Sequence, residues 1–309
     1  MVGSQGVVVR KTVRPAPREV ISAPVLWGYV ALTKPPIIGL LLVTALGGLF
    51  LASEGPPPGG IALAVLLGGA LAAGGANAIN HYLDRDLDAL MTRTRSRPLP
   101  AHLVTPSSAL AFGVGLNVLG FLVLAAGANV LSAGLALASS GFYVFVYTGW
   151  LKRRTAQNIV IGGVAGAMPP LVAWAAVTGS LGWPALFLFL IIVFWTPPHF
   201  WALALMMRDD YAAAGLPMLP VVRGERHTCR AIFVYTGLLV ATTLAAYAAT
   251  TLGLVFLASA SVLGAIFLWE AWRVLRYSHP GRVLRLYLYS LAYLAALFLS
   301  VLVDTIIGT

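Results

Sequence analysis

The chain has 309 residues, of which 59% are hydrophobic and only 10% are charged, and its mean hydropathy is +0.88. Soluble domains average about 45–50% apolar and about 25% charged residues, so this composition excludes a soluble protein and predicts an integral membrane protein. The net charge of +10 would indicate a nucleic-acid partner in a soluble protein, and in a membrane protein it is first compared with topology. The single cysteine, Cys229, excludes a disulfide framework.

The chain begins with a polar segment, residues 1–23, which contains four basic residues and two prolines. This segment lacks the apolar stretch and the small-residue cleavage site of a signal peptide. We therefore predict a flexible cytoplasmic tail that stays attached. Residues 24–309 are predicted to form a single membrane domain.

Apolar segments of about 20 residues, the length that crosses a bilayer, follow one another to the C-terminus. We predict nine transmembrane helices at residues 25–52, 61–83, 105–125, 128–149, 158–178, 183–206, 230–250, 252–275 and 285–306. The two longer connections between them are 84–104 and 207–229. The predicted fold class is all-α, a polytopic helical bundle.

The basic residues predict the orientation of this bundle. If the tail is cytoplasmic and the helices alternate, all 20 Lys and Arg residues lie on the cytoplasmic side, and Glu54 and Asp304 are the charged residues near the other face. Short loops rich in Lys and Arg mark the cytoplasmic side. We predict a protein of the cell inner membrane with a cytoplasmic N-terminus and a C-terminus on the opposite side. Topology and anionic lipid explain the charge, so no nucleic-acid partner is expected.

The second predicted helix runs into the polar string NAINHYLDRDLDALMTRTRSRPLP, residues 77–100. Asn80, Asp84 and Asp88 are spaced four residues apart, so they line one helix face, whereas Asp86 lies on another face. Two carboxylates and an amide oxygen are hard ligands suited to Mg²⁺. The pattern predicts a cation site at the cytoplasmic end of this helix.

Arginines 93, 95 and 97 follow this acidic face. Carboxylates beside arginines suit a Mg²⁺-bound diphosphate, because the metal bridges acid and phosphate while Arg neutralises the remaining oxygens. The alternative is a loop with solvated acids, in which the arginines only set topology.

A second acidic pair, Asp209 and Asp210, opens the other long connection on the same side of the membrane. Lys152 and Arg153 end the fourth predicted helix on that side, shortly after Tyr147. Two acidic clusters at the ends of apolar helices can face each other across a cavity that is polar at the cytoplasmic end and apolar below. A diphosphate head with a long hydrocarbon tail is the ligand that such a cavity predicts.

Several strings resemble the UbiA superfamily of intramembrane prenyltransferases. The N-x-x-x-D-x-x-x-D pattern at residues 80–88 is similar to the first motif of that superfamily. The strings DRDLDALMTRTRSRPLP, YTGWLKRRTAQNIVIGGVAGAMPPLVAW, WTPPHFWALAL and DDYAAAGLPMLPVV resemble its protohaem IX farnesyltransferase branch. The resemblance covers roughly residues 25–306 and implies nine helices around a central cavity, with the active site at the cytoplasmic side.

The resemblance also implies an activity. The enzymes it points to use Mg²⁺ to transfer a farnesyl group from farnesyl diphosphate to a vinyl group of haem B (protohaem IX), with addition of water, giving haem O and diphosphate. The partners implied are farnesyl diphosphate, haem B, membrane lipid and a downstream haem A synthase. The alternative is another intramembrane prenyltransferase, acting on a quinone precursor or other aromatic acceptor, because the Asp motif alone does not select the acceptor. A transporter is disfavoured because the acids cluster at one surface.

The resemblance assigns roles to single residues. The catalytic acids expected are Asp84, Asp88, Asp209 and Asp210, and the metal ligands expected are Asn80, Asp84, Asp88 and Asp209. The residues expected to bind substrate are Asn80, Arg93, Arg97, Tyr147, Lys152, Arg153 and His199. Met206 stands where many members have the first Asp of D-x-x-D-D, so the first cluster is expected to matter more for metal binding.

His199 lies in an apolar run after two prolines, where an ionisable residue is a functional candidate. It is the candidate haem ligand. On an unbroken helix, His199 and Asp210 would share a face about 16 Å apart. The alternative is a histidine hydrogen-bonded to a carbonyl freed by the prolines. His81, seven residues before Asp88, is expected to orient an acid.

Overall fold

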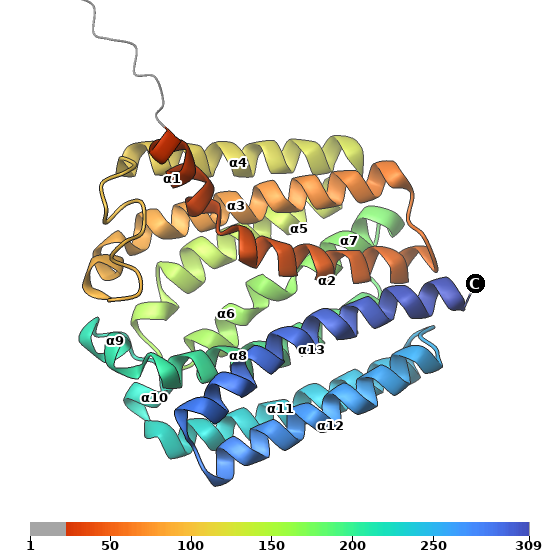
Figure 1. Cartoon of the computed structure of the whole chain (residues 1–309). Coiled ribbons are helices and arrows are strands. Elements are labelled where there is room, and N and C mark those ends of the chain that lie inside the picture. Colours follow the sequence, from red (N-terminus) through yellow and green to blue (C-terminus); the bar gives the residue numbers. More distant parts are fainter. Residues whose placement is uncertain (1–22, 309) are drawn as a thin grey trace, which may run out of the picture.

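The computed structural model of the chain describes residues 23–308. This part of the chain is helical apart from short connections and contains no strand. Nine of its helical segments are long and apolar enough to cross a membrane, and they pack side by side as a bundle (Figure 1). The predicted all-α fold with nine transmembrane helices is confirmed, and the chain is a multi-pass membrane protein.

Helical elements make up both parts of the bundle. The first part contains α1 (Ala23–Thr33), α2 (Pro35–Ser53), α3 (Gly59–Leu90), α4 (Pro106–Gly127), α5 (Val130–Gly141), the π-helical turn η1 (Phe142–Thr148) and the 3-10 turn η2 (Leu151–Arg153). The second part contains α6 (Asn158–Ala167), α7 (Pro169–Thr178), α8 (Trp183–Met206), α9 (Arg208–Ala213), α10 (Leu219–Val222), α11 (Gly224–Ala249), α12 (Leu254–Arg276) and α13 (Pro280–Ile307). The predicted tail lies outside the described residues except for Ala23, which begins α1.

Two of the predicted boundaries are wrong in ways that affect the site. The second predicted helix, 61–83, continues as α3 to Leu90, so Asp84 and Asp88 lie on a helix and not in the connection that follows. The seventh begins at Gly224 and not at residue 230. Charged side chains at these ends lowered the apparent hydropathy, although the backbone hydrogen bonds of a helix can continue beyond the apolar stretch.

Prolines divide two of the predicted spans. Proline has no N–H to donate and disfavours the helical conformation in the residue before it. Lys34 precedes Pro35 and has a left-handed backbone with φ 56°, so α1 and α2 meet at an angle there. Pro169 begins α7 after α6, whereas the pair at 197–198 lies inside α8 without ending it.

One end of the bundle carries the two longest connections, residues 91–105 and 207–223 (Figure 1). We call this the loop end, and the C-terminus lies at the opposite end. Among the described residues, the connections at that opposite end, 54–58, 128–129, 179–182 and 250–253, contain no Lys or Arg. This is the asymmetry from which the orientation was predicted, and the cytoplasmic position of the loop end stays a prediction.

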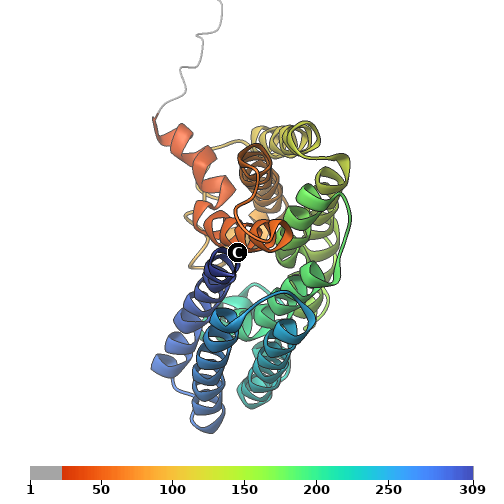
Figure 2. The same cartoon turned by 90° about the vertical axis from the view of Figure 1, so that its right-hand side faces the viewer.

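The buried apolar side chains form two main clusters. The larger cluster comes mainly from α8, α11, α12 and α13, and the second from α2, α3, α4, α5 and α7. Figure 2 shows these groups as the lower and upper parts of the bundle. Helix α2 joins them because it packs against both α7 and α13.

Helices α3 and α4 approach closely through glycines. A Cβ atom added to Gly75 would lie 2.5 Å from the carbonyl oxygen of Gly113, and one added to Gly120 would lie 2.9 Å from the carbonyl oxygen of Gly68. Lipid provides little hydrophobic drive for association between helices, so close contact of small residues matters more than in water. This contact holds the N-terminal half of the helix that carries Asp84.

We expect Gly75→Ala to destabilise the fold by about 1–3 kcal/mol through overpacking, measured as a lower midpoint of thermal unfolding in detergent. Gly69→Ala is the matched control on the same helix, because the nearest atom to its added Cβ would be Leu42 Cδ2 at 3.9 Å. Both variants gain the same helix propensity, so the difference between them isolates packing. Equal midpoints would contradict the expectation.

Candidate active site

Asn80, Asp84 and Asp88 lie on three successive turns of α3 near the loop end. Their side chains are almost fully buried, with 3%, 1% and 3% of each residue exposed. The prediction that these three share one helix face is confirmed, and Asp86 points away with 60% of its side chain exposed. Burying two carboxylates is costly unless cations and hydrogen bonds compensate them.

Two predicted basic residues provide that compensation. The Lys152 ammonium lies 2.5 Å from Asp84 Oδ2, and one Arg97 nitrogen contacts both oxygens of Asp88, at 2.8 and 2.9 Å. Lys152 comes from η2, and Arg97 comes from the connection after α3. That connection folds back because the Thr94 hydroxyl donates to the Asp88 carbonyl at 3.0 Å and the Arg97 N–H donates to the Thr94 carbonyl at 3.0 Å.

A third cation, Lys34, was not among the predicted site residues. Its ammonium donates to Asn80 Oδ1 at 2.7 Å. The left-handed backbone between α1 and α2 directs it there, and the Asn77 amide donates to the Thr33 carbonyl beside the break at 2.9 Å. A charged residue inside an apolar span was the available signal, but in the sequence it was read only as a marker of topology.

Arg153 has a different partner from the one expected. Its guanidinium makes two hydrogen bonds of 2.9 Å to Asp86, on the exposed face of α3. It approaches Asp84 Oδ1 only to 4.0 Å. In this structure Arg153 therefore holds η2 against α3, and its contact with diphosphate stays a prediction.

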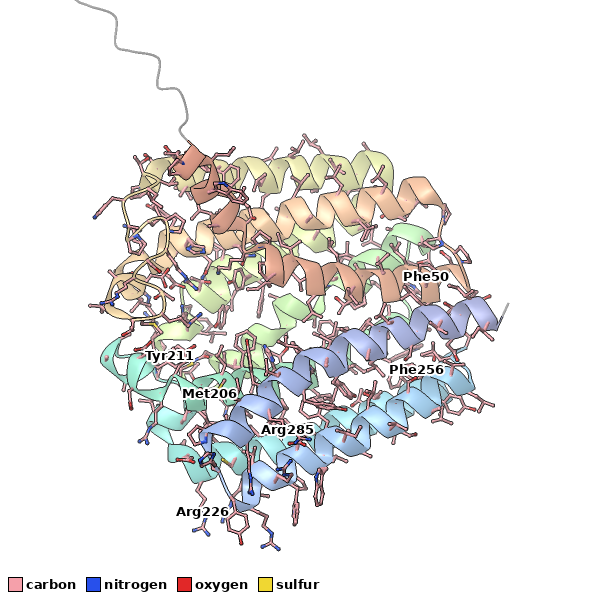
Figure 3. All side chains as sticks on the ribbon, in the orientation of Figure 1. Phe50, Met206, Tyr211, Arg226, Phe256 and Arg285 are labelled. Carbon is pink, nitrogen blue, oxygen red and sulfur yellow. The ribbon has the colours of Figure 1, made fainter. Side chains whose placement is uncertain are left out.

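The second acidic pair lies in the first turn of α9 at the same end of the bundle. A pocket of about 360 Å³ opens beside it, lined by Thr92, Arg93, Met206, Met207, Asp209 and Asp210. Figure 3 shows Met206 and Tyr211 at this end. Burial raises the pKa of Tyr211, and the positive charge of Arg93 opposes that rise. The pocket thus brings predicted basic and acidic residues together at its mouth.

The two acidic clusters do not merge into one metal-binding group. No three His, Cys, Asp or Glu side chains within residues 23–308 lie close enough to hold an ion together. Helix α8 also ends at Met206, and α9 begins separately at Arg208. The prediction of one continuous helical face from His199 to Asp210 is therefore wrong, because the chain turns between the two helices.

Some buried polar atoms at the first cluster have no hydrogen-bond partner. They are Asp84 Oδ1 and both ring nitrogens of His81, and His81 Nδ1 lies 3.9 Å from Asp88 Oδ2. Leaving such groups unpaired costs about 1–3 kcal/mol each. An unpaired carboxylate oxygen next to a second carboxylate and an amide oxygen fits Mg²⁺, which prefers oxygen ligands.

The turn η1 brings two aromatic side chains to the site. Tyr143 and Tyr147 stack with ring centroids 5.6 Å apart. Gly162 allows this, because a Cβ there would overlap the Tyr147 ring. Short π-helical turns recur at functional sites, and this one also places Thr148 Oγ1 within 3.0 Å of Asn80 Nδ2.

His199 is buried in an aromatic sandwich on α8. Its ring stacks on Trp195 at 4.4 Å and on Tyr287 at 4.8 Å. Its Nδ1 lies 2.7 Å from Ser290 Oγ, so the alternative of a proline-freed carbonyl as partner is wrong. Since the Ser290 hydroxyl donates to the Tyr287 carbonyl at 2.6 Å, Nδ1 carries the proton of the His–Ser bond. Nε2 then keeps its lone pair, because the bond made by one ring nitrogen sets the state of the other.

Solved structures share this fold. The chain covers 99% of a structure described as digeranylgeranylglyceryl phosphate synthase, with a TM-score of 0.75, 17% identity and 91% of this chain matched. It covers 99% of a UbiA homologue from Archaeoglobus fulgidus solved with GPP and Mg²⁺, with a TM-score of 0.60, 17% identity and 89% of this chain matched. At these identities the likeness concerns the fold alone.

The sequence comparisons reach further. A protein named protoheme IX farnesyltransferase from Gloeobacter violaceus is 51% identical over 90% of this chain and 92% of its own length. One with the same name from Symbiobacterium thermophilum is 51% identical over 92% of this chain and 95% of its own. The profile of the UbiA prenyltransferase family matches residues 41–302. The chain therefore belongs to the UbiA prenyltransferase family.

Proposed function

We propose that this enzyme transfers the farnesyl group of farnesyl diphosphate to a vinyl group of haem B, with addition of water, and so produces haem O and diphosphate. The observation that carries the proposal is the buried face of Asn80, Asp84 and Asp88, surrounded by three cations at the end of an apolar bundle. The choice of acceptor is supported by the names of relatives that are 51% identical over nine-tenths of the chain.

Mg²⁺ is the cofactor that the donor atoms of this site fit. Asn80 Oδ1 and the carboxylates of Asp84 and Asp88 would hold it, and Asp209 is the ligand proposed from the second cluster. When bound, the metal would neutralise the charge that develops on the leaving diphosphate. An archaeal UbiA homologue has been solved with GPP and Mg²⁺, which supports the same cofactor in this enzyme.

The three cations are proposed to bind diphosphate oxygens. Lys34, Arg97 and Lys152 hold Asn80, Asp88 and Asp84 respectively in this structure. A metal ion on those oxygens would take over the compensation of the two acids, and the three side chains would then be available to the phosphates. Cations placed where charge develops stabilise the leaving group as the C–O bond breaks. Arg93, at the mouth of the pocket, is proposed to guide the diphosphate in, and Arg153 to contact it from the edge.

The bond changes follow from this arrangement. The C–O bond of farnesyl diphosphate breaks and its electron pair leaves on diphosphate. The π electrons of the haem vinyl group form the new C–C bond, and the resulting cation takes up water and releases a proton. Aromatic faces attract cations, so Tyr147, stacked on Tyr143, is proposed to bind the allylic end of the farnesyl group.

His199 is proposed to contact haem B. Its lone pair on Nε2 makes it a candidate ligand of haem iron, and Trp195 and Tyr287 hold the ring in place. We also propose that the loop end faces the cytoplasm and that the membrane is the cell inner membrane, because of the distribution of Lys and Arg. The haem A synthase expected as a downstream partner has no observation in its favour.

We expect purified enzyme incubated with haem B, farnesyl diphosphate and Mg²⁺ to yield a porphyrin with the mass of haem O. Asp84→Asn should lower the rate at least about 100-fold, the loss typical of removing one electrostatic stabiliser. Asp86→Asn is the matched control, because this acid points away from the site. Full activity of Asp84→Asn would contradict the site, and a prenylated phenol without haem O would contradict the acceptor.

We expect Lys34→Met to raise the KM for farnesyl diphosphate at least about tenfold, because loss of a buried charged contact costs more than about 1.4 kcal/mol. Steady-state kinetics at saturating haem B measure the change. Arg226→Met removes a cation that is exposed at the loop end (Figure 3) and should leave KM unchanged. The same KM in the Lys34 variant and in the unmodified enzyme would rule out its contact with diphosphate.

We expect His199→Ala to weaken haem B binding, followed as a change in the Soret band during titration, and to leave the affinity for farnesyl diphosphate unchanged. The reason is that His199 lies in the aromatic sandwich and makes no contact with the acidic face. His227→Ala, at an exposed histidine on α11, is the control. Unchanged haem affinity and an unchanged Soret band would remove His199 from the haem site.

A further inference from the structure

The side-chain amide of Asn80 contacts three different groups. Its oxygen accepts from the Lys34 ammonium at 2.7 Å. Its nitrogen donates to Asp84 Oδ2 at 2.8 Å and to Thr148 Oγ1 at 3.0 Å. An amide turned by 180° would place its N–H groups against the ammonium and its oxygen against two acceptors, so these contacts together select one orientation.

Two of these three groups are exchangeable. Lys34 and Asp84 are the groups proposed to take new partners when diphosphate and Mg²⁺ bind. Once the ammonium leaves Asn80 and the carboxylate turns to the metal, neither of them holds the amide. Thr148 is neutral and belongs to η1, so its position does not depend on which cation occupies the site.

Thr148 can act only as an acceptor towards Asn80. Its hydroxyl donates its single proton to the Tyr143 carbonyl at 2.9 Å, five residues earlier, and the residue is 1% exposed. The π-helical turn makes this bond available, as shown by the neighbouring Gly149 N–H, which also reaches five residues back to the Val144 carbonyl at 3.0 Å. The lone pair of Thr148 Oγ1 therefore faces the Asn80 NH₂ group.

We propose that Thr148 is a positioning residue, which holds the Asn80 amide so that its oxygen faces the cation position in both the empty and the loaded site. This inference rests on the proposed function, since it assumes that Asn80 Oδ1 binds Mg²⁺. Thr148 itself touches neither metal nor substrate. It acts through Asn80, and the π-helical turn serves to present it.

The test is a calorimetric titration of purified enzyme with Mg²⁺ in the presence of inorganic pyrophosphate. Thr148→Val keeps the shape of the side chain and removes the acceptor, which leaves a buried N–H unpaired and should raise the apparent Kd for Mg²⁺ about tenfold. Thr148→Ser keeps the hydroxyl and should restore the affinity. Thr236→Val is the matched control, because Thr236 is a fully buried helical threonine whose hydroxyl also donates to a carbonyl of its own helix, that of Ile232.

A double-mutant cycle separates positioning from a general structural role. In an Asn80→Ala background, Thr148→Val should have no further effect on Mg²⁺ affinity; an additive loss would overturn the proposal, as would an unchanged Kd in Thr148→Val alone. Thr148→Ala replaces the valine variant if that variant does not fold. Asp84→Asn reports on the proposed function separately. If its Mg²⁺ affinity is also unchanged, the metal site itself is wrong, whereas if only Thr148→Val is silent, the positioning role alone is wrong.

Discussion

The compensation of two buried carboxylates by cations is the interaction on which the loop end of this protein depends. Asp84 and Asp88 are 1% and 3% exposed, and removing one partner from such a buried pair is strongly destabilising. Lys152 and Arg97, which pair with them, come from η2 and from the connection after α3, and Lys34 reaches the same face from the break between α1 and α2. The charges thus draw three separate parts of the chain onto one helix, in the arrangement that a diphosphate and a divalent cation require.

Irregular backbone places these groups. Lys34 has a left-handed conformation before two prolines, and the π-helical turn of η1 brings Thr148 against Asn80. Non-helical backbone at membrane depth is tolerated where protein surrounds it, and strained backbone recurs at functional sites. The regular helices hold the bundle together through side-chain packing and close glycine contacts, while its irregular turns carry the site.

Several elements were predictable because they depend on local patterns. Nine apolar segments follow from the length of a bilayer, and the shared face of Asn80, Asp84 and Asp88 follows from helical periodicity. The helix boundary at Leu90 was missed because hydropathy falls before the helix ends. The turn between α8 and α9 was missed because nothing in the residues between His199 and Asp210 marks where α8 ends, which is set by the packing at the loop end.

The sequence by itself determined the fold class, the family and the acidic face of α3, because periodicity, hydropathy and motif spacing are properties of neighbouring residues. Only the tertiary structure decided which cation compensates which acid. Arg153 pairs with Asp86, Lys152 with Asp84 and Arg97 with Asp88, and Lys34 joins the site from a position 46 residues before Asn80. Such pairings depend on distances between helices that are remote in the chain, and Coulomb attraction in a buried site changes steeply over a few ångströms.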